Sequence, residues 1–377
     1  MTQTQTHTPA TGGLQNDRRR FVAGAATLLS GGSLTACAVA PTADTRGRFE
    51  FALIGDMPYN RAQEAEYHRV MQELNARDLA FVTHVGDFQF DPRPYERNPD
   101  SSRPPGEDAT YDYVLGTFNA SKNPLVMTPG DNDWADLVEM QLHKVDPLER
   151  LAKVRSLFFP QGSSLGQRRI PVTSQADVDS AHAAFRENLN WSIGGVDFVT
   201  LHIIGSNDNR GRGPVLETEQ RQRKAANLSW LQRAFARARE RKSLGLVIIT
   251  HANIGFENLW PASYHRRYYR PLSGAKAPRP EPTVYDDYIR ALGAEMEDFE
   301  APTLLLHGDT HIFRIDKPLF STRTQRPFEH FTRVETFGWP DTHWVSIEVD
   351  PAQSQVFTVR PHMVPGNSPN RRPLPAG

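Results

Sequence analysis

The sequence predicts an α/β fold that forms one domain, and three observations carry this prediction. Apolar runs alternate along the chain with stretches of helical spacing, which is typical of strands joined by helices. The apolar runs show little alternation with polar residues, as expected for strands buried on both faces. Between residues 48 and 360, no linker is long enough to separate two domains. We therefore place the domain at 48–360.

Each expected strand is a short apolar run, and most of these runs end at Gly, Asp or His. Gly194 and Gly195 separate two of the runs and favour a hairpin between them. The expected strands are 49–54, 79–85, 125–128, 190–193, 196–204, 246–250 and 303–306, with further strands up to about 359.

Each expected helix places apolar residues three or four positions apart, as Val70 and Leu74 do in the first and Leu231 and Phe235 in the longest. The expected helices are 63–76, 111–119, 146–158, 217–242 and 284–299. Irregular surface segments are expected at 91–107, 160–180 and 262–283.

The composition excludes several classes of protein. With 38% hydrophobic and 23% charged residues, the chain is neither a disordered polyelectrolyte nor a multispan membrane protein. Its formal net charge of −1 gives no basic field that would favour nucleic acid, and no nucleic-acid partner is expected. The single Cys excludes an intrachain disulfide and a Cys-based zinc finger.

Residues 1–37 are typical of an export signal rather than of a fold. Arg18, Arg19 and Arg20 precede Phe21 and a short apolar run rich in Gly and Ser. This is the pattern of a signal peptide, and the run is too short to span a bilayer comfortably. The paired Arg before Phe favours the twin-arginine route, with an ordinary Sec signal as the alternative.

The signal ends in Leu-Thr-Ala-Cys at 34–37, which resembles a bacterial lipobox whose Cys becomes the lipidated first residue. The rival is cleavage after Ala40. We expect Cys37 to carry a lipid that holds the protein at the membrane, in the periplasm or cell envelope. The flanking segments are a tether at 38–47 and a Pro-rich tail at 361–377.

Polar residues follow five of the apolar runs, where the strands end. In an open α/β sheet the carboxyl ends of the strands border the ligand crevice, so five such ends together indicate a site. Carboxylate, amide oxygen and imidazole without thiolate suit zinc, manganese or iron(II). His202, just before Gly205-Ser206-Asn207, is a candidate for bordering the same site. The polar residues at the strand ends are Asp56, Asp87, Asp131, Asn132, Asp133, His251, Asp309 and His311.

Over residues 49–315, the order of these motifs resembles the calcineurin-like metallophosphoesterase superfamily, and the chain looks like a divergent bacterial member. The resemblance implies a four-layer α/β/β/α sandwich with two divalent ions, manganese, iron or zinc, at the strand ends. It also implies a phosphorylated substrate, hydrolysed by metal-bound hydroxide. The alternative is a non-catalytic binding or scaffolding protein on a degenerate phosphoesterase fold.

The resemblance also assigns roles, one residue at a time. A bridging aspartate would hold both ions, and each ion would have further ligands of its own. The matching positions are Asp56 and His311 for the first metal, Asp87 as the bridge, and Asn132 and His251 for the second metal.

Two departures leave the first metal short of a ligand. Pro58 stands where the family has a His ligand. Purple acid phosphatases replace that His with a Tyr three residues after the bridging Asp, but this position is Phe90 here. Tyr59, His84 and His307 are the candidates to fill that position.

Two further departures concern the second metal and the acid. The loop at 130–133 lacks the family's general-acid His and its register is ambiguous, so Asp131 is a ligand candidate beside Asn132. Asp133 is the candidate for the missing acid, and Asn132 is counted with it as catalytic. Asp309 replaces a His, which keeps a metal ligand but adds negative charge.

Overall fold

The structure is a computed structural model, and it describes residues 47–92, 102–140, 144–264 and 282–367. The expected export signal, Cys37 and all but the last residue of the expected tether lie outside these ranges, as does most of the segment 262–283. Within the described ranges, no helix combines the length and apolar character that a membrane crossing needs.

The strands form two sheets. In the five-stranded sheet, β1, β2 and β3 run parallel, and β11 and β12 add an antiparallel edge beside β1. In spatial order this sheet contains β12 (Phe357–His362), β11 (Trp344–Val349), β1 (Phe49–Ile54), β2 (Val82–His84) and β3 (Leu125–Met127).

In the seven-stranded sheet, β6, β7, β8 and β10 run parallel. β5 joins β6 as the antiparallel hairpin expected at Gly194-Gly195. In spatial order this sheet contains β4 (Thr173–Ser174), β5 (Leu189–Ile193), β6 (Val196–Thr200), β7 (Gly245–Ile249), β8 (Thr303–His307), β10 (Phe331–Glu335) and β9 (Arg314–Asp316).

A side-chain cap marks the start of three α-helices, α1, α4 and α5. Asn60 accepts a hydrogen bond from the Gln63 main chain at the start of α1, and Asp146 accepts one from Leu148 before α4. The α-helices are α1 (Arg61–Asn75), α3 (Asp108–Asn119), α4 (Pro147–Phe158), α5 (Gln175–Val178), α6 (Pro214–Arg241) and α8 (Asp286–Met296). Short 3₁₀ turns are η2 (Ala135–Glu139), η3 (Ser180–His182), η4 (Ser206–Asn209) and η5 (Phe256–Leu259).

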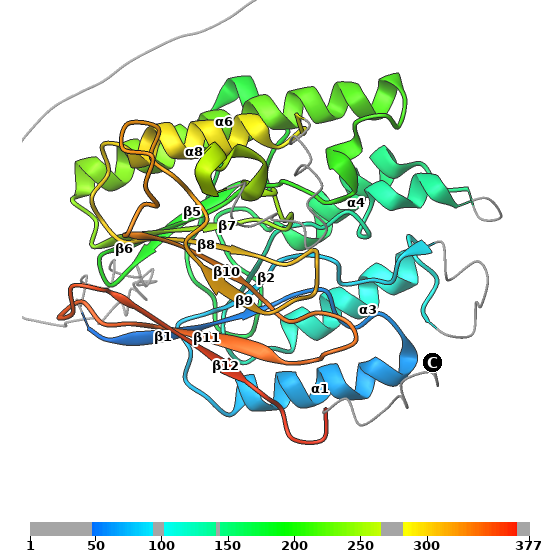
Figure 1. The fold of residues 1–377 in the computed structure, drawn as a ribbon. Coiled ribbons are helices and arrows are strands. Elements are labelled where there is room, and N and C mark those ends of the chain that lie inside the picture. The colour runs from blue at the N-terminus through cyan, green and yellow to red at the C-terminus, as the bar shows by residue number, and fades with distance from the viewer. Residues whose placement is uncertain (1–46, 93–101, 141–143, 265–281, 368–377) are drawn as a thin grey trace, which may run out of the picture. The chain divides into compact units, whose positions relative to one another are not determined.

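Figure 1 shows the two sheets stacked between helices, with α1 below the smaller sheet and α6 and α8 above the larger one. Aromatic side chains join the sheets: the ring of Phe198 lies 5.4 Å from that of Phe51 and 5.1 Å from that of Phe81. On the other face of the larger sheet, buried Trp230 and Phe235 of α6 share a core with Leu292 of α8. The predicted four-layer α/β/β/α sandwich, with one domain, is confirmed.

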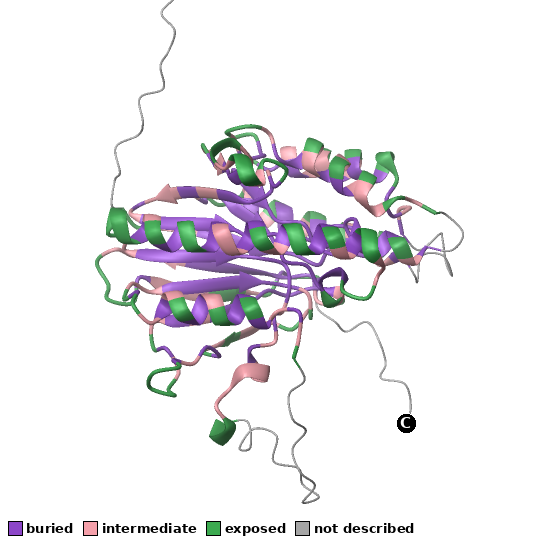
Figure 2. Cartoon of the chain, turned by 90° about the horizontal axis from the view of Figure 1, so that it is seen from above, coloured by how far each residue is buried: buried purple, intermediate pink, exposed green. Residues whose placement is uncertain are grey.

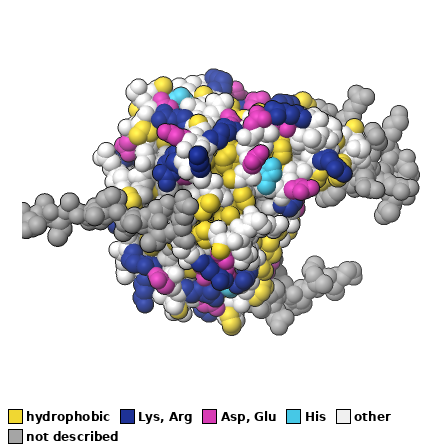
Figure 3. All heavy atoms as spheres, turned by 90° about the vertical axis from the view of Figure 1, so that its left-hand side faces the viewer, with side chains coloured by type: hydrophobic (Ala, Val, Ile, Leu, Met, Phe, Trp, Pro, Cys, Tyr) yellow, Lys and Arg dark blue, Asp and Glu magenta, His cyan; other side chains and the backbone are white. Residues whose placement is uncertain are grey.

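The parallel strands β2, β3, β6, β7 and β8 are buried along their whole length, whereas the edge strands β9 and β12 are partly exposed. The helices expose one face, as Figure 2 shows for those above the larger sheet. The burial of the parallel strands explains why they read as apolar runs without alternation. On the face shown in Figure 3, Lys and Arg are interspersed with Asp and Glu, and hydrophobic side chains lie between them.

Most boundaries differ from the sequence prediction by a few residues, and three differences are larger. β6 ends at Thr200 rather than 204, because the Asn188 side chain accepts a hydrogen bond from the His202 main chain in place of a neighbouring strand. The segment 160–180 is not wholly irregular, since it contains β4 and α5. The chain beyond 360 belongs to the fold as far as Asn367, whose side chain is buried and donates to Glu66 O and Thr342 O.

Candidate metal centre

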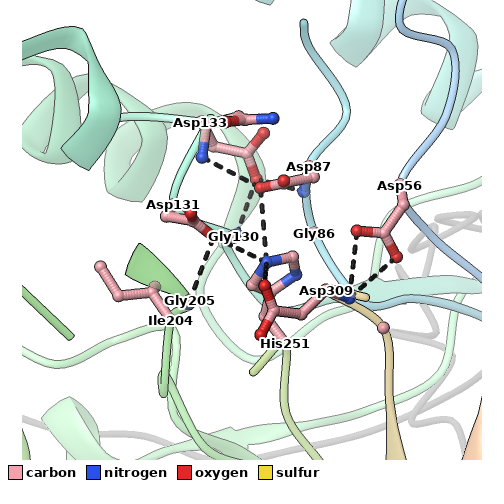
Figure 4. Close-up of polar contacts among 12 residues, drawn as sticks. Asp56, Gly86, Asp87, Gly130, Asp131, Asp133, Ile204, Gly205, His251 and Asp309 are labelled. Atoms are coloured by element: carbon pink, nitrogen blue, oxygen red, sulfur yellow. Dashed lines mark hydrogen bonds and ion pairs between the residues drawn. The ribbon is translucent and has the colours of Figure 1, made fainter. Parts of the chain in front are cut away.

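The parallel strands of both sheets bring polar side chains to one edge of the sandwich. Asp56 follows β1, Asp87 follows β2, Asp131 follows β3, His251 follows β7 and Asp309 follows β8. In Figure 4, Asp87, Asp131 and Asp309 lie around His251, and Asp56 lies to one side. Residues separated by more than 250 positions in the sequence thus share one site, as their place at the strand ends predicts.

Two groups of possible metal ligands overlap at His251. The first contains Asp56, Asp87 and His251, the second contains Asp131, His251 and Asp309, and in each the ligand atoms lie within 4.8 Å of one another. His251 Nε2 lies 2.8 Å from Asp131 Oδ1, 3.6 Å from Asp87 Oδ1 and 4.0 Å from Asp309 Oδ1. One imidazole therefore faces three carboxylates.

The main chain orients His251. Its Nδ1 lies 2.8 Å from Val85 O, so Nδ1 carries a hydrogen and donates it to this carbonyl. Nε2 then points at the carboxylates. A histidine whose second nitrogen is held in this way is preset to ligate a metal through Nε2.

On the other side of Asp87 lie Asp56, His311 and Tyr59. His311 Nε2 is 3.5 Å from Asp56 Oδ1. The Tyr59 hydroxyl donates to Asp87 Oδ2 at 2.8 Å and lies 3.3 Å from His311 Nε2. Asp87 therefore presents Oδ2 to this group and Oδ1 to His251, as a carboxylate between two ions would.

Of the three residues expected to fill the first metal's missing position, the structure brings only Tyr59 into these contacts. His84 is fully buried and its Nδ1 accepts a hydrogen bond from the Gly86 main chain. His307 is also buried, with Nδ1 2.9 Å from Gly308 O. Both histidines are engaged with the backbone beside the site.

The structure also distinguishes Asp131 from Asn132. The carboxylate of Asp131 points at His251, whereas Asn132 contributes its main-chain N–H, which donates to Asp87 Oδ1 at 3.0 Å. The geometry favours Asp131 as the ligand and gives the backbone of Asn132 the task of orienting Asp87.

Main-chain N–H groups of two loops surround the carboxylate of Asp133. It is fully buried, and its two oxygens accept hydrogen bonds from the main chains of Asp87, Phe88 and Gly130 at 2.8–3.0 Å. Burial raises the pKa of Asp133 to about 7, although the hydrogen bonds from these three main-chain donors lower it. Both of its oxygens thus hold the loops that carry Asp87 and Gly130, and the role of Asp133 as the acid stays a prediction.

Four of the site residues have a backbone that L-residues rarely adopt. The φ angles are 55° at Asp56, 53° at Asp87, 79° at Asp309 and 62° at His311. Each such residue costs about 1–3 kcal/mol and persists only where its surroundings impose it. Strain gathered at four converging side chains indicates a functional site.

Glycine leaves room for the carboxylates. A Cβ on Gly205 would lie 2.5 Å from Asp309 Oδ1 and 2.7 Å from Asp131 Oδ1, and one on Gly308 would lie 2.1 Å from Asp56 Oδ2. No real Cβ approaches an oxygen so closely, so the site requires glycine at both positions.

The cluster carries more negative charge than its own histidines offset. Burial, together with the charges of Asp131 and Asp133, raises the pKa of Asp87 well above its usual value. Burial alone would lower the pKa of His251, but Asp87 and Asp131 outweigh it and raise that pKa well above the usual range. Buried carboxylates that resist ionisation fit a site that binds cations.

Two contacts were not expected from the sequence. The Ser206 hydroxyl lies 2.7 Å from Asp131 Oδ2, and the Asn253 main-chain N–H donates to Asp309 Oδ2 at 2.9 Å. Ser206 lies in the turn after His202, but His202 itself is fully buried against Glu187 and Trp134. The turn, and not the histidine, reaches the centre.

No protein-family model matches the chain, and no curated protein matches it in sequence. Solved structures similar to it include PhoD, with a TM-score of 0.48 and 12% identity over 83% of this chain and 65% of that chain. The chain thus covers less than two thirds of PhoD. Another is a dimetal phosphatase from Danio rerio, with a TM-score of 0.42 and 12% identity over 79% of this chain and 92% of that chain.

Proposed function

We propose that this chain is a phosphoesterase that depends on two divalent metal ions held at the centre described above. The observation that carries the proposal is the pair of ligand groups that overlap at His251, with Asp87 presenting one oxygen to each side. Hard oxygens and imidazole are the donors that manganese, iron and zinc accept.

The ligands divide into two sets that share Asp87. Tyr59 supplies the oxygen that the first set otherwise lacks, and Asp309 supplies an oxygen where the family has an imidazole. The first ion would be held by Asp56, Asp87, His311 and Tyr59, and the second by Asp87, Asp131, His251 and Asp309. Asn132 stays a predicted side-chain ligand.

Two ions in such a site supply Lewis acidity toward a phosphoryl group and make water acidic enough to attack it near neutral pH. The chain's own residues preset the geometry. Val85 O fixes the imidazole of His251, and the Asn132 main chain fixes Asp87. Asp133 accepts hydrogen bonds from the main chains of Asp87 and Gly130 and so joins the two loops that carry them.

Chromogenic phosphomonoesters and phosphodiesters, assayed with each of manganese, iron and zinc, test this function when combined with a metal count on the purified protein. We expect two ions per chain and metal-dependent hydrolysis of at least one ester class. One ion or none, without hydrolysis of either class, would favour a binding or scaffolding protein instead.

Replacing Tyr59 with phenylalanine should weaken binding of one ion and reduce the rate by at least about 10–100-fold, because loss of a group that only supports a metal ligand already costs that much. Loading with iron(III) gives a second readout, because a phenolate ligand produces a visible absorption band that Tyr59→Phe would remove. Tyr67→Phe is the matched control, since the buried Tyr67 hydroxyl has no hydrogen-bond partner among the residues that the structure describes. Equal metal affinity in wild type and Tyr59→Phe would exclude Tyr59 as a ligand.

We further propose that the chain is exported by the twin-arginine route and anchored by a lipid on Cys37, in the periplasm or cell envelope. Cys37→Ser should block labelling by a palmitate analogue and release the protein from membranes. Changing Arg18 and Arg19 to lysine should stop export, whereas normal export would indicate the Sec route. Unchanged membrane partitioning of Cys37→Ser would contradict the anchor.

A further inference from the structure

We propose that Ser206 is a positioning residue for the second ion, acting through the carboxylate of Asp131. This inference rests on the proposed function. Ser206 Oγ lies 2.7 Å from Asp131 Oδ2, and the adjacent Gly205 N–H donates to Asp131 Oδ1 at 3.2 Å. Two neighbouring donors thus hold both oxygens of one carboxylate and fix its plane.

The hydroxyl hydrogen of Ser206 has one better acceptor. Ser206 Oγ also lies 3.2 Å from Asp136 Oδ2, which is farther than the 2.7 Å to Asp131 Oδ2. A hydroxyl donates one hydrogen at a time, so the closer carboxylate, that of Asp131, receives it. Asp131 Oδ1, 2.8 Å from His251 Nε2, is then the oxygen that faces the ion.

The backbone that carries Ser206 adopts a conformation that its sequence disfavours. Four consecutive residues other than glycine, Ser206, Asn207, Asp208 and Asn209, have φ angles of 49°, 57°, 49° and 65°. Runs of this kind persist only where the surrounding structure imposes them, and they gather at functional sites.

Side chains of helix α6 hold this conformation in place. Arg223 is fully buried, forms an ion pair with Asp208 and donates to His202 O at 3.1 Å. Gln220 Nε2 donates to the other oxygen of Asp208 at 3.0 Å. The strained turn is therefore locked between α6 and the centre, in the one arrangement that brings the Ser206 hydroxyl to Asp131.

Replacing Ser206 with glycine separates positioning from folding. Glycine adopts a φ of 49° freely, so Ser206→Gly removes the hydroxyl and relieves the backbone at the same time. We expect the unfolding temperature of the metal-free protein to equal or exceed that of wild type. The dissociation constant for one of two Mn²⁺ ions, measured by titration calorimetry, should rise about 10–100-fold, and that for the other should not change.

Lys242→Gly is the matched control. Lys242 ends α6 with a φ of 51°, so glycine relieves a similar backbone strain without contact with the centre. It should raise the unfolding temperature and leave both Mn²⁺ affinities unchanged.

Two outcomes would overturn the role of Ser206 alone: unchanged Mn²⁺ affinities in Ser206→Gly, or a lower unfolding temperature with both ions lost. The second would mean that Ser206 only maintains the fold. A wild-type chain that binds no Mn²⁺, iron or zinc would overturn the proposed function, and the role of Ser206 with it.

Discussion

Replacing Asp87 with asparagine is expected to abolish metal-dependent hydrolysis and to release at least one of the two ions. Asp87 is the carboxylate that the two proposed ligand sets share, with Oδ2 at Tyr59 and Oδ1 at His251. Loss of a group that merely supports a ligand costs about 10–100-fold in affinity, so loss of a shared direct ligand should cost more than 100-fold. Metal content by elemental analysis and the hydrolysis rate measure this effect.

Asparagine is the informative replacement because it keeps the shape of Asp87 and tolerates its φ of 53°. The folded chain binds the Asp87 proton more tightly than the unfolded chain, because burial raises its pKa. In the metal-free protein this carboxyl therefore costs stability as the pH rises above the usual pKa of an aspartate. Asp87→Asn should remove that cost, so its metal-free unfolding temperature at pH 7 should not fall below that of wild type.

The matched control is Asp197→Asn. Asp197 is another buried aspartate, on β6, whose partners include Ser192 and Ser243 rather than residues of the centre. This variant should lose stability but keep both ions. If Asp87→Asn retained two ions and the wild-type rate, the assignment of Asp87 as the shared ligand would be wrong.

Replacing Asp309 with histidine is expected to shift the metal preference from manganese or iron toward zinc and to lower the pH at which the rate rises. Asp309 is the position where this chain has a carboxylate and the superfamily that its sequence resembles has a histidine, and its Oδ1 lies 4.0 Å from His251 Nε2. Oxygen ligands suit manganese relative to zinc, which accepts imidazole well. Removing one negative charge from the ligand set should also lower the pKa of water bound at the ions.

Competition binding of zinc against manganese, and pH–rate profiles in each metal, measure the two effects separately. Asp309→Asn separates charge from ligand type, because it removes the charge but keeps an oxygen. Histidine and asparagine are both tolerated at the φ of 79° found here. We expect both variants to lower the pH of the rising limb, and only the histidine variant to favour zinc. If neither variant changed metal affinity, Gly308-Asp309 would be a turn and not a ligand position.

Much of the fold was predictable because strands buried on both faces and amphipathic helices leave plain patterns in the sequence. The strand at Phe49–Ile54 and the hairpin at Gly194-Gly195 were predicted correctly. The errors occur where a tertiary contact replaces a local one. β6 ends early because the Asn188 side chain takes the His202 N–H, and no pattern in 196–204 shows this.

The location of the centre was predictable for a similar reason: parallel strands that end in Asp or His must meet at one edge of the sheets. The choice among adjacent residues was not. Asp131 and Asn132 are neighbours, and each has a side-chain oxygen that could bind a metal. Only the conformation of the loop directs the Asp131 carboxylate to His251 and the Asn132 main-chain N–H to Asp87. The sequence gives no sign of the contacts of Asp133, whose side chain accepts hydrogen bonds from three main-chain N–H groups.

The sequence by itself determined the α/β architecture, the edge of the sheets that carries the site, and the excess of oxygen donors there. These follow from hydrophobic periodicity and from the order of polar residues along the chain, which are local properties. Only the tertiary structure decided that Tyr59, rather than His84 or His307, reaches the ligand cluster, and that the Ser206 hydroxyl lies 2.7 Å from Asp131 Oδ2. The physical reason is that the direction of a side chain depends on its backbone angles and on partners that are distant in the sequence. Here the left-handed turns at the centre are imposed by groups such as Arg223 on α6, which lie far away in the sequence.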